Sequence, residues 1–192
     1  LPLVLPRGWA ESPPYFSAAT ETVVDLANNR LSDETYVPAH HHLDDVAASV
    51  PVEPPSSCVP CSASAVPIPQ ALDPSLQHST KDPLQYVDIF VDDFISAAQR
   101  PFLRRVRRAL LHAIDDVFRP LSADDSEHRR EPVSMKKLLK GDCSWSTVKL
   151  VLGWIIDTVN MTIQLPQHRV DRLWEILNSI PRHQKRTSVK KW

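Results

Sequence analysis

Residues 85–97 read QYVDIFVDDFISA, and this stretch decides the fold. Tyr86–Val91 and Phe94–Ala97 are two runs rich in β-branched and aromatic residues, and only Asp92 and Asp93 separate them. Two such runs joined by two residues predict a tight antiparallel hairpin. Adjacent acids are poor strand formers and repel each other when buried, so we expect both at the tip of the hairpin.

Amphipathic helices are expected on both sides of this hairpin. Ser12-Pro13-Pro14 is a typical helix start, and apolar residues at three- and four-residue spacing continue to about Asn29. Between Phe102 and Phe118, apolar residues occupy one helical face, and four arginines with two aspartates occupy the other. A third amphipathic helix is expected after Pro166.

The remaining segments predict strands and one long insertion. A short strand is expected near Val133–Leu139, and Thr147–Ile156 and Met161–Leu165 predict a second hairpin. Residues 31–83 contain nine prolines and no sustained periodicity, so we expect a disordered insertion there. The order helix, hairpin, helix, hairpin, helix predicts an α+β fold.

The net charge of −1 conceals a strong asymmetry. Residues 1–98 carry a net charge of −10, and residues 99–192 carry +9. Such a basic half indicates either a polyanionic partner or an ordinary solvated surface. The arginines of the central helix can be interpreted in two ways. We expect them either to contact a nucleic-acid backbone or to pair with Asp115, Asp116 or the acidic half.

Several classes of protein are excluded or disfavoured. No run of about 18 apolar residues occurs, which excludes a membrane-spanning helix. Three cysteines are too few for a disulfide scaffold. Cys58 and Cys61 have zinc-like spacing, and three histidines lie at positions 40–42, but no second ligand pair follows. We interpret the cysteines as loop thiols.

The Asp92-Asp93 pair is the chemical centre of the sequence. Mg²⁺ prefers a few carboxylates together with phosphate oxygens, and two-metal phosphoryl transfer requires a rigid acidic cluster. The alternative is a solvated Asp-Asp turn without a bound cation.

Three segments favour the first interpretation, because they resemble reverse transcriptases of retroviruses and LTR retrotransposons. Phe90-Val91-Asp92-Asp93 resembles the aromatic-x-Asp-Asp box of that family. Residues 5–16, LPRGWAESPPYF, resemble its Leu-Pro-Gln-Gly-aromatic segment, and Leu152-Gly153-Trp154 resembles its primer grip. Pro166 and the helix after it resemble the start of the thumb.

The resemblance implies a partial polymerase palm followed by the start of a thumb. Residues 1–30 and 84–145 would belong to the palm, residues 146–166 to the primer-grip hairpin, and residues 167–192 to the thumb and a basic tail. Residues 31–83 would be the insertion. The implied partners are an RNA or DNA template with its primer and deoxynucleoside triphosphates, without a membrane. The implied location is intracellular, either cytoplasmic or nuclear.

The resemblance also implies roles for individual residues. Asp92 and Asp93 would be the catalytic, metal-binding pair, with Mg²⁺ (or Mn²⁺) as the cofactor. The residues implied to lie near the nucleotide are Arg7, Gly8, Phe16, and Lys136 or Lys137. Those implied to hold the primer are Leu152, Gly153 and Trp154. Arg7 stands where the family usually has Gln, and an arginine there could hold phosphate instead.

One departure concerns the catalytic site itself. The family supplies another metal-binding Asp from a strand before the Leu-Pro-x-Gly segment, whereas residues 1–4 contain no acid. We therefore expect a piece of a longer enzyme, inactive alone, whose partner is the fingers and first-palm segment of the same polyprotein. The alternatives are a non-catalytic nucleic-acid-binding or scaffolding remnant, and an inert α+β domain.

Overall fold

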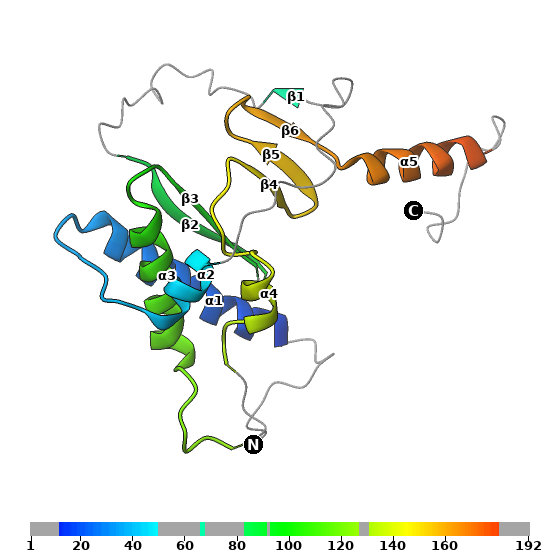
Figure 1. The fold of residues 1–192 in the computed structure, drawn as a ribbon. Helices are drawn as coiled ribbons and strands as arrows, with labels where there is room; N and C mark the ends of the chain where they lie inside the picture. Colours follow the sequence, from blue (N-terminus) through cyan, green and yellow to red (C-terminus); the bar gives the residue numbers. More distant parts are fainter. Residues whose placement is uncertain (1–11, 50–65, 68–82, 92, 127–130, 181–192) are drawn as a thin grey trace. The chain divides into compact units, whose positions relative to one another are not determined.

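A computed structural model of the chain describes residues 12–49, 66–67, 83–91, 93–126 and 131–180. These residues form an α+β protein with five helices and two small antiparallel sheets (Figure 1). They divide into two units. Unit 1 contains the described residues up to position 49 and those from 83 to 145, and unit 2 contains residues 66–67 and 146–180. No helix among the described residues is long and apolar enough to cross a bilayer.

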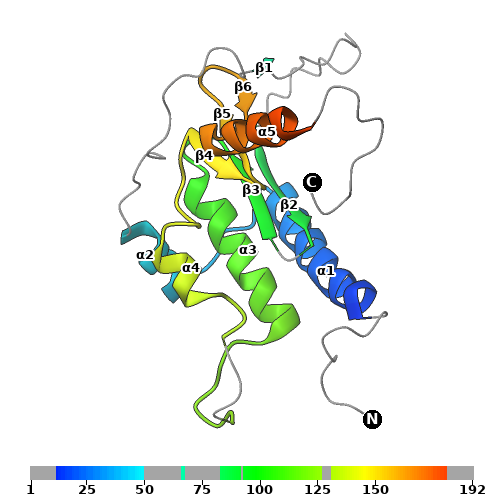
Figure 2. The ribbon, with the colours of Figure 1, turned by 90° about the vertical axis from the view of Figure 1, so that its right-hand side faces the viewer.

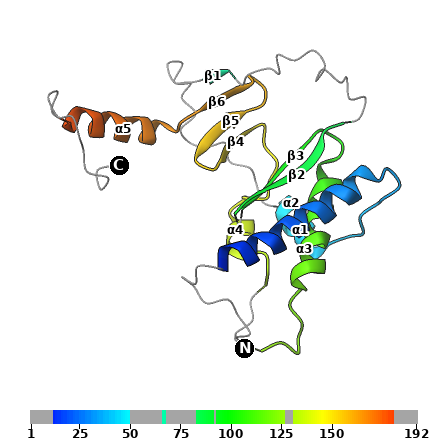
Figure 3. The same cartoon turned by 180° about the vertical axis from the view of Figure 1, so that it is seen from behind.

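Unit 1 is built from two long helices and the predicted hairpin. Helices α1 (Ser12–Ser32) and α3 (Leu103–Phe118) pack together, and α1 also packs on the hairpin strand β2 (Gln85–Phe90) (Figures 1 and 3). Strand β3 (Asp93–Ala98) pairs with β2. The core consists of the apolar faces of these elements, with the buried residues Val23, Val24, Ala27, Leu31, Val87, Val106, Ala109, Ala113 and Ile114.

The hairpin turn lies one residue earlier than the sequence predicted. Phe90 pairs with Asp93, so the connection is Val91-Asp92 and Asp93 is the first residue of β3. The prediction that both acids form the turn is therefore wrong for Asp93. Asp92 itself lies outside the described residues.

The side chain of Asn28 completes one edge of β2. Its amide nitrogen donates to the carbonyl oxygen of Val87 at 2.8 Å, and its amide oxygen accepts from the Val87 N–H at 3.0 Å. These are the two bonds that a neighbouring strand would make. Val87 is fully buried, so its main-chain groups need these partners.

Residues 33–49 differ from the expected disordered insertion. Helix α1 continues to Ser32. Helix α2 (His42–Ser49) packs on α3 and on α4 (Met135–Leu139). Figure 2 shows α2 and α4 on one side of α3. The prediction of disorder was based on the proline count of the whole segment, whereas the local spacing of apolar residues in α2 suits a helix. The buried cluster that α2, α3 and α4 share consists of Leu43, Ala47, Leu111 and Leu138.

The strand expected near residues 133–139 is also wrong, because α4 occupies this segment. Met135-Lys136-Lys137-Leu138-Leu139 consists of good helix formers. Ser134 is the N-cap, and its side chain accepts from the Lys137 N–H. Helix propensity and a cap therefore decide this short element.

Unit 2 contains a four-stranded antiparallel sheet in the order β1-β6-β5-β4 and the helix α5 (Gln167–Ser179). The strands are β1 (Val66–Pro67), β4 (Val148–Val151), β5 (Trp154–Asp157) and β6 (Thr162–Gln164). The single strand expected over residues 147–156 is wrong, because β4 and β5 form a hairpin of their own. Helix α5 begins directly after Pro166, as predicted. Residues 50–65 and 68–82 of the expected insertion lie outside the described residues.

We predict that Asn28→Ala lowers the free energy of unfolding by about 2–4 kcal/mol, because it leaves the buried N–H and C=O of Val87 without partners. Urea denaturation followed by circular dichroism measures this change. The matched control is Asn29→Ala, since Asn29 is the next residue of α1 and is exposed. Equal stability of the two variants would contradict the assigned role of Asn28.

Candidate functional site

The tip of the β2–β3 hairpin brings together two residues that the sequence singled out. Asp93 Oδ1 accepts from the ammonium group of Lys137 at 2.9 Å, although the two residues are 44 positions apart. The two side chains are 50% and 59% exposed, respectively. An exposed carboxylate with a cationic partner therefore lies directly at the hairpin turn.

Helix α4 fixes the backbone position of Lys137. The next residue, Leu138, is 1% exposed and packs in the cluster that α2 and α3 form. Because Leu138 is anchored, the adjacent Lys137 points out of the cluster and reaches the hairpin. The place of this lysine therefore depends on α2, the helix that the sequence analysis did not predict.

Val91 has an unusual backbone conformation at the turn. Its φ angle is 60°, a value that β-branched residues rarely adopt. The Thr20 hydroxyl lies 3.4 Å from the Val91 carbonyl oxygen and 3.1 Å from that of Ser17. Thr20 is 2% exposed. Strained backbone of this kind is concentrated at functional sites.

Sequence reasoning missed Thr20, although a signal was present. Thr20 is a polar residue on the buried face of a predicted amphipathic helix, and such a residue needs a hydrogen-bond partner. Phe16, one of the implied nucleotide-site residues, precedes it by one helical turn. Its ring lies 6.4 Å from the ring of Phe118, and its side chain is 39% exposed.

The other implied site residues are placed as follows. Lys136 is exposed on α4, and Arg7 and Gly8 lie outside the described residues. Leu152, Gly153 and Trp154 belong to unit 2, where Leu152 and Gly153 form the turn between β4 and β5.

This turn has the backbone of a tight hairpin. The φ angles of Leu152 and Gly153 are 50° and 83°, and a type I′ turn requires positive values at both positions. Leu152 and Trp154 are each 43% exposed. The guanidinium of Arg169 occupies the space that a Cβ at Gly153 would take. The turn therefore presents two apolar side chains and one cationic group.

The arginines of α3 bind groups of this chain, which agrees with the pairing that the sequence left open as one alternative. Arg107 and Arg108 form ion pairs with Asp44, and Arg104 forms ion pairs with Asp44 and Asp45. Arg105 donates to main-chain carbonyls in the last turn of α1 and in the segment after it, and to the Gln85 side chain. The arginine face therefore pairs with the acidic half.

Asp44 is the centre of this network and is fully buried. Burial by itself raises the pKa of the Asp44 carboxyl, but hydrogen bonds from Arg108 and Arg107 and their positive charges outweigh it. The pKa therefore lies below its ordinary value of 3.8. The carboxylate is ionised and compensates the largely buried guanidinium of Arg107.

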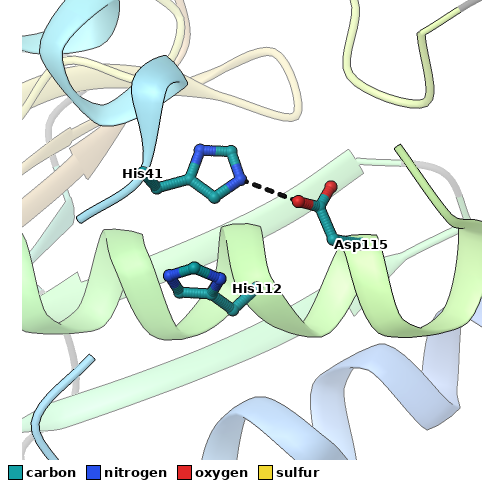
Figure 4. Close-up of side chains that lie close together, drawn as sticks. All are labelled: His41, His112 and Asp115. Carbon is teal, nitrogen blue, oxygen red and sulfur yellow. Dashed lines mark hydrogen bonds and ion pairs between the residues drawn. The ribbon is translucent and has the colours of Figure 1, made fainter. Parts of the chain in front are cut away.

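A second cluster, consisting of His41, His112 and Asp115, has the composition of a metal site (Figure 4). Their candidate ligand atoms lie within 4.8 Å of one another. His41 precedes α2 and is 4% exposed, and the other two residues lie on α3. His41 Nε2 lies 3.0 Å from Asp115 Oδ2, and His112 Nε2 lies 3.1 Å from the Ala39 carbonyl oxygen.

The hydrogen bonds of His41 oppose a metal at this cluster. Its Nδ1 accepts from the Leu43 N–H at 3.2 Å, so the network assigns the ring hydrogen to Nε2, which donates to Asp115. A metal-binding histidine instead donates its second ring N–H to an acceptor. A metal on Nε2 would place the ring hydrogen of Nδ1 against the Leu43 N–H. The cluster is therefore a structural link between α2 and α3.

Comparison of the chain with models of protein families, with curated proteins and with solved structures finds no match.

We predict that Asp44→Asn lowers the free energy of unfolding at pH 7 by about 3–5 kcal/mol, because it leaves the largely buried Arg107 guanidinium without its counter-charge. The Asp44 pKa is lower in the folded state, so its stabilisation is complete above the unfolded-state pKa. It is lost as the pH falls through the folded-state value. The difference between wild type and Asp44→Asn should therefore shrink in acid, as urea denaturation at several pH values would measure.

The matched control for this prediction is Asp45→Asn. Asp45 neighbours Asp44 and also pairs with Arg104, but its side chain is 54% exposed. We expect only a small shift of its denaturation midpoint. A loss as large as that of Asp44→Asn would mean that surface charge, rather than burial, determines the effect.

For the histidine cluster, we predict that Zn²⁺ does not raise the thermal midpoint of the wild-type chain. We expect His41→Asn and His41→Gln each to lower the free energy of unfolding by about 1–2 kcal/mol. Asn retains an acceptor near the position of Nδ1, and Gln retains a donor near that of Nε2. Differential scanning fluorimetry with and without Zn²⁺ measures the thermal midpoint, and urea denaturation measures the free energy of unfolding of the variants. A Zn²⁺-dependent rise that His41→Asn abolishes would establish a metal site instead.

Proposed function

We propose that this chain is a palm and thumb segment of a reverse transcriptase of the retroviral or LTR-retrotransposon type. In the complete enzyme it would contribute to template-directed DNA synthesis. The observation that carries the proposal is the hairpin tip, where Phe90 pairs with Asp93 across the turn and Val91 has a positive φ angle. Asp93 accepts a hydrogen bond from the ammonium group of Lys137 there.

The tip suits a divalent cation. Asp93 is half-exposed, and one of its oxygens accepts an ammonium group at 2.9 Å, so the carboxylate lies where a cation has access. Asp92 and Asp93 would hold Mg²⁺ or Mn²⁺ together with a third acid from the first part of the palm. Two such ions activate the attacking oxygen and stabilise the leaving group of a phosphoryl transfer.

The chain's other groups would position the reactants. Lys137 carries positive charge at the tip, as nucleotide phosphates require, and Lys136 is exposed on the same helix. Phe16 would pack behind the nucleotide pocket with Arg7 and Gly8. In unit 2, the β4–β5 turn would support the primer through Leu152, Gly153 and Trp154. The exposed Trp154 ring suits stacking on a base or sugar, and Arg169 suits contact with phosphate.

The alternative of a non-catalytic nucleic-acid-binding remnant has less support. It depends on the basic half, to which the arginines of α3 belong. Those guanidinium groups pair with Asp44 and Asp45 or donate to main-chain carbonyls. The two carboxylates thus compensate part of this cationic surface within the chain, and we favour the polymerase assignment.

We predict that the chain alone incorporates no deoxynucleotide, and that fusion to a fingers and first-palm segment carrying the third acid yields template-dependent incorporation. Asp92→Asn or Asp93→Asn should lower the activity of that fusion at least about a hundredfold, because each removes a metal-binding charge. Primer extension on a defined template measures this.

The control variant is Asp88→Asn, since Asp88 is an exposed aspartate of β2 in the same hairpin and should not affect extension. Undiminished extension by the Asp92→Asn fusion would exclude catalysis at this tip.

A further inference from the structure

We infer that a groove in unit 1 binds a small phosphate ester with a planar aromatic part. The groove has a volume of about 800 Å³, which is within the range of sites for small ligands. It is lined by the end of α1 and the segment after it, by the start of β2 and by the first turns of α3. The groove is thus at the open end of the β2–β3 hairpin, and the inference does not depend on the function proposed for the hairpin tip.

The charge of the groove favours an anionic ligand. Three arginines of α3 line it, and they are Arg104, Arg105 and Arg108. Among the described residues of the lining, Glu34 is the one acid, so three positive groups face one negative group. The first turn of α3 contains no acidic residue either, and the positive end of the helix dipole adds to the charge of the arginines.

Arg105 is a partly buried guanidinium that forms no ion pair with a described carboxylate. Its N–H groups donate to neutral oxygens, among them the main-chain carbonyls of Leu31 at 3.1 Å and Asp33 at 2.7 Å. These hydrogen bonds fix the side chain, but the acceptors carry no negative charge. Because a buried cation is stabilised by a nearby opposite charge, an anion in the groove would compensate Arg105.

Arg104 and Arg108 are held in place and still have donors to offer. The Nε atoms of both contact Asp44 Oδ2, at 3.3 and 2.8 Å, and the full burial of Asp44 fixes the direction of the two side chains. Asp45 contacts Nη2 of Arg104. The other terminal nitrogens of these two arginines have no partner among the described residues. Guanidinium groups one helical turn apart can bind the oxygens of one phosphate together.

Apolar and aromatic side chains form much of the remaining lining and favour an ester over inorganic phosphate. Tyr36 and Phe102 are half-buried, and Val37, which follows Tyr36, is 84% exposed. Inorganic phosphate would leave these side chains in water. A planar ring beside the phosphate would cover them, and burial of apolar surface and stacking on aromatic rings both strengthen binding.

The first measurement separates the two parts of the ligand. Equilibrium dialysis of the full chain uses adenosine monophosphate, adenosine and inorganic phosphate as probes, at about 0.15 M KCl, where distant charges are screened. We expect adenosine monophosphate to bind at least about tenfold more tightly than either of the others, because it alone offers both the phosphate and the ring.

The second measurement assigns this binding to the groove through exposed side chains of opposite charge. Arg104→Gln should weaken the binding of adenosine monophosphate about tenfold, because it removes a charged donor to the phosphate. Glu34→Gln should strengthen it about threefold, because it removes a repelling carboxylate. The control is Arg172→Gln on α5, where the arginine has an exposed ion pair with Glu175, and we expect a change of less than about twofold.

Three results would overturn the inference. Equal affinities for adenosine monophosphate and inorganic phosphate, or no binding of either, would contradict the ligand class. Unchanged affinities of Arg104→Gln and Glu34→Gln would place the binding outside the groove. Competition by a single-stranded oligonucleotide at concentrations about a hundredfold lower would assign the groove to a nucleic-acid strand instead. Circular dichroism of each variant confirms that folded proteins are compared.

Discussion

Unit 1 depends on the compensation of one buried carboxylate, that of Asp44, by the guanidinium groups of Arg107 and Arg108. This interaction holds α2 against a face of α3 that would otherwise be polar surface. With α2 in place, Leu138 has an apolar cluster to enter, and α4 is fixed. The position of Lys137 beside the hairpin tip therefore follows from a charge pair in another part of the unit.

The uneven distribution of charge along the chain has the same explanation. Asp44, Asp45 and Asp93 belong to the acidic half, whereas their partners on α3 and α4 belong to the basic half. The pairs link the halves internally. An asymmetry of this kind indicates a polyanionic partner only when the basic groups remain exposed. Here Arg107 is largely buried against Asp44, whereas Arg104 keeps 60% of its side chain exposed.

Local patterns predicted most of the elements whose stability is largely local, with α4 as the exception. The central hairpin, the two long helices and the helix after Pro166 each have strong periodicity or clear end signals, and the structure contains all of them. Helix α2 was missed because the prolines of the surrounding segment outweighed its local apolar spacing. Its partners on α3 are more than 60 positions away, as the bond from Arg107 to Asp44 shows, and give no local signal. Thr20 and Asn28 were missed for a related reason. Their partners are main-chain groups of the hairpin, which no spacing rule identifies.

The β4–β5 turn gives Gly153 a second effect besides its backbone freedom. The positive φ angle restricts the choice of residue, because a side chain there strains the backbone. The missing Cβ also leaves the space that the Arg169 guanidinium occupies. That guanidinium is the end of a flexible side chain, so an added Cβ would push it aside. A single methyl group at residue 153 would thereby alter the electrostatic potential over the turn, although the number of charged residues stays the same.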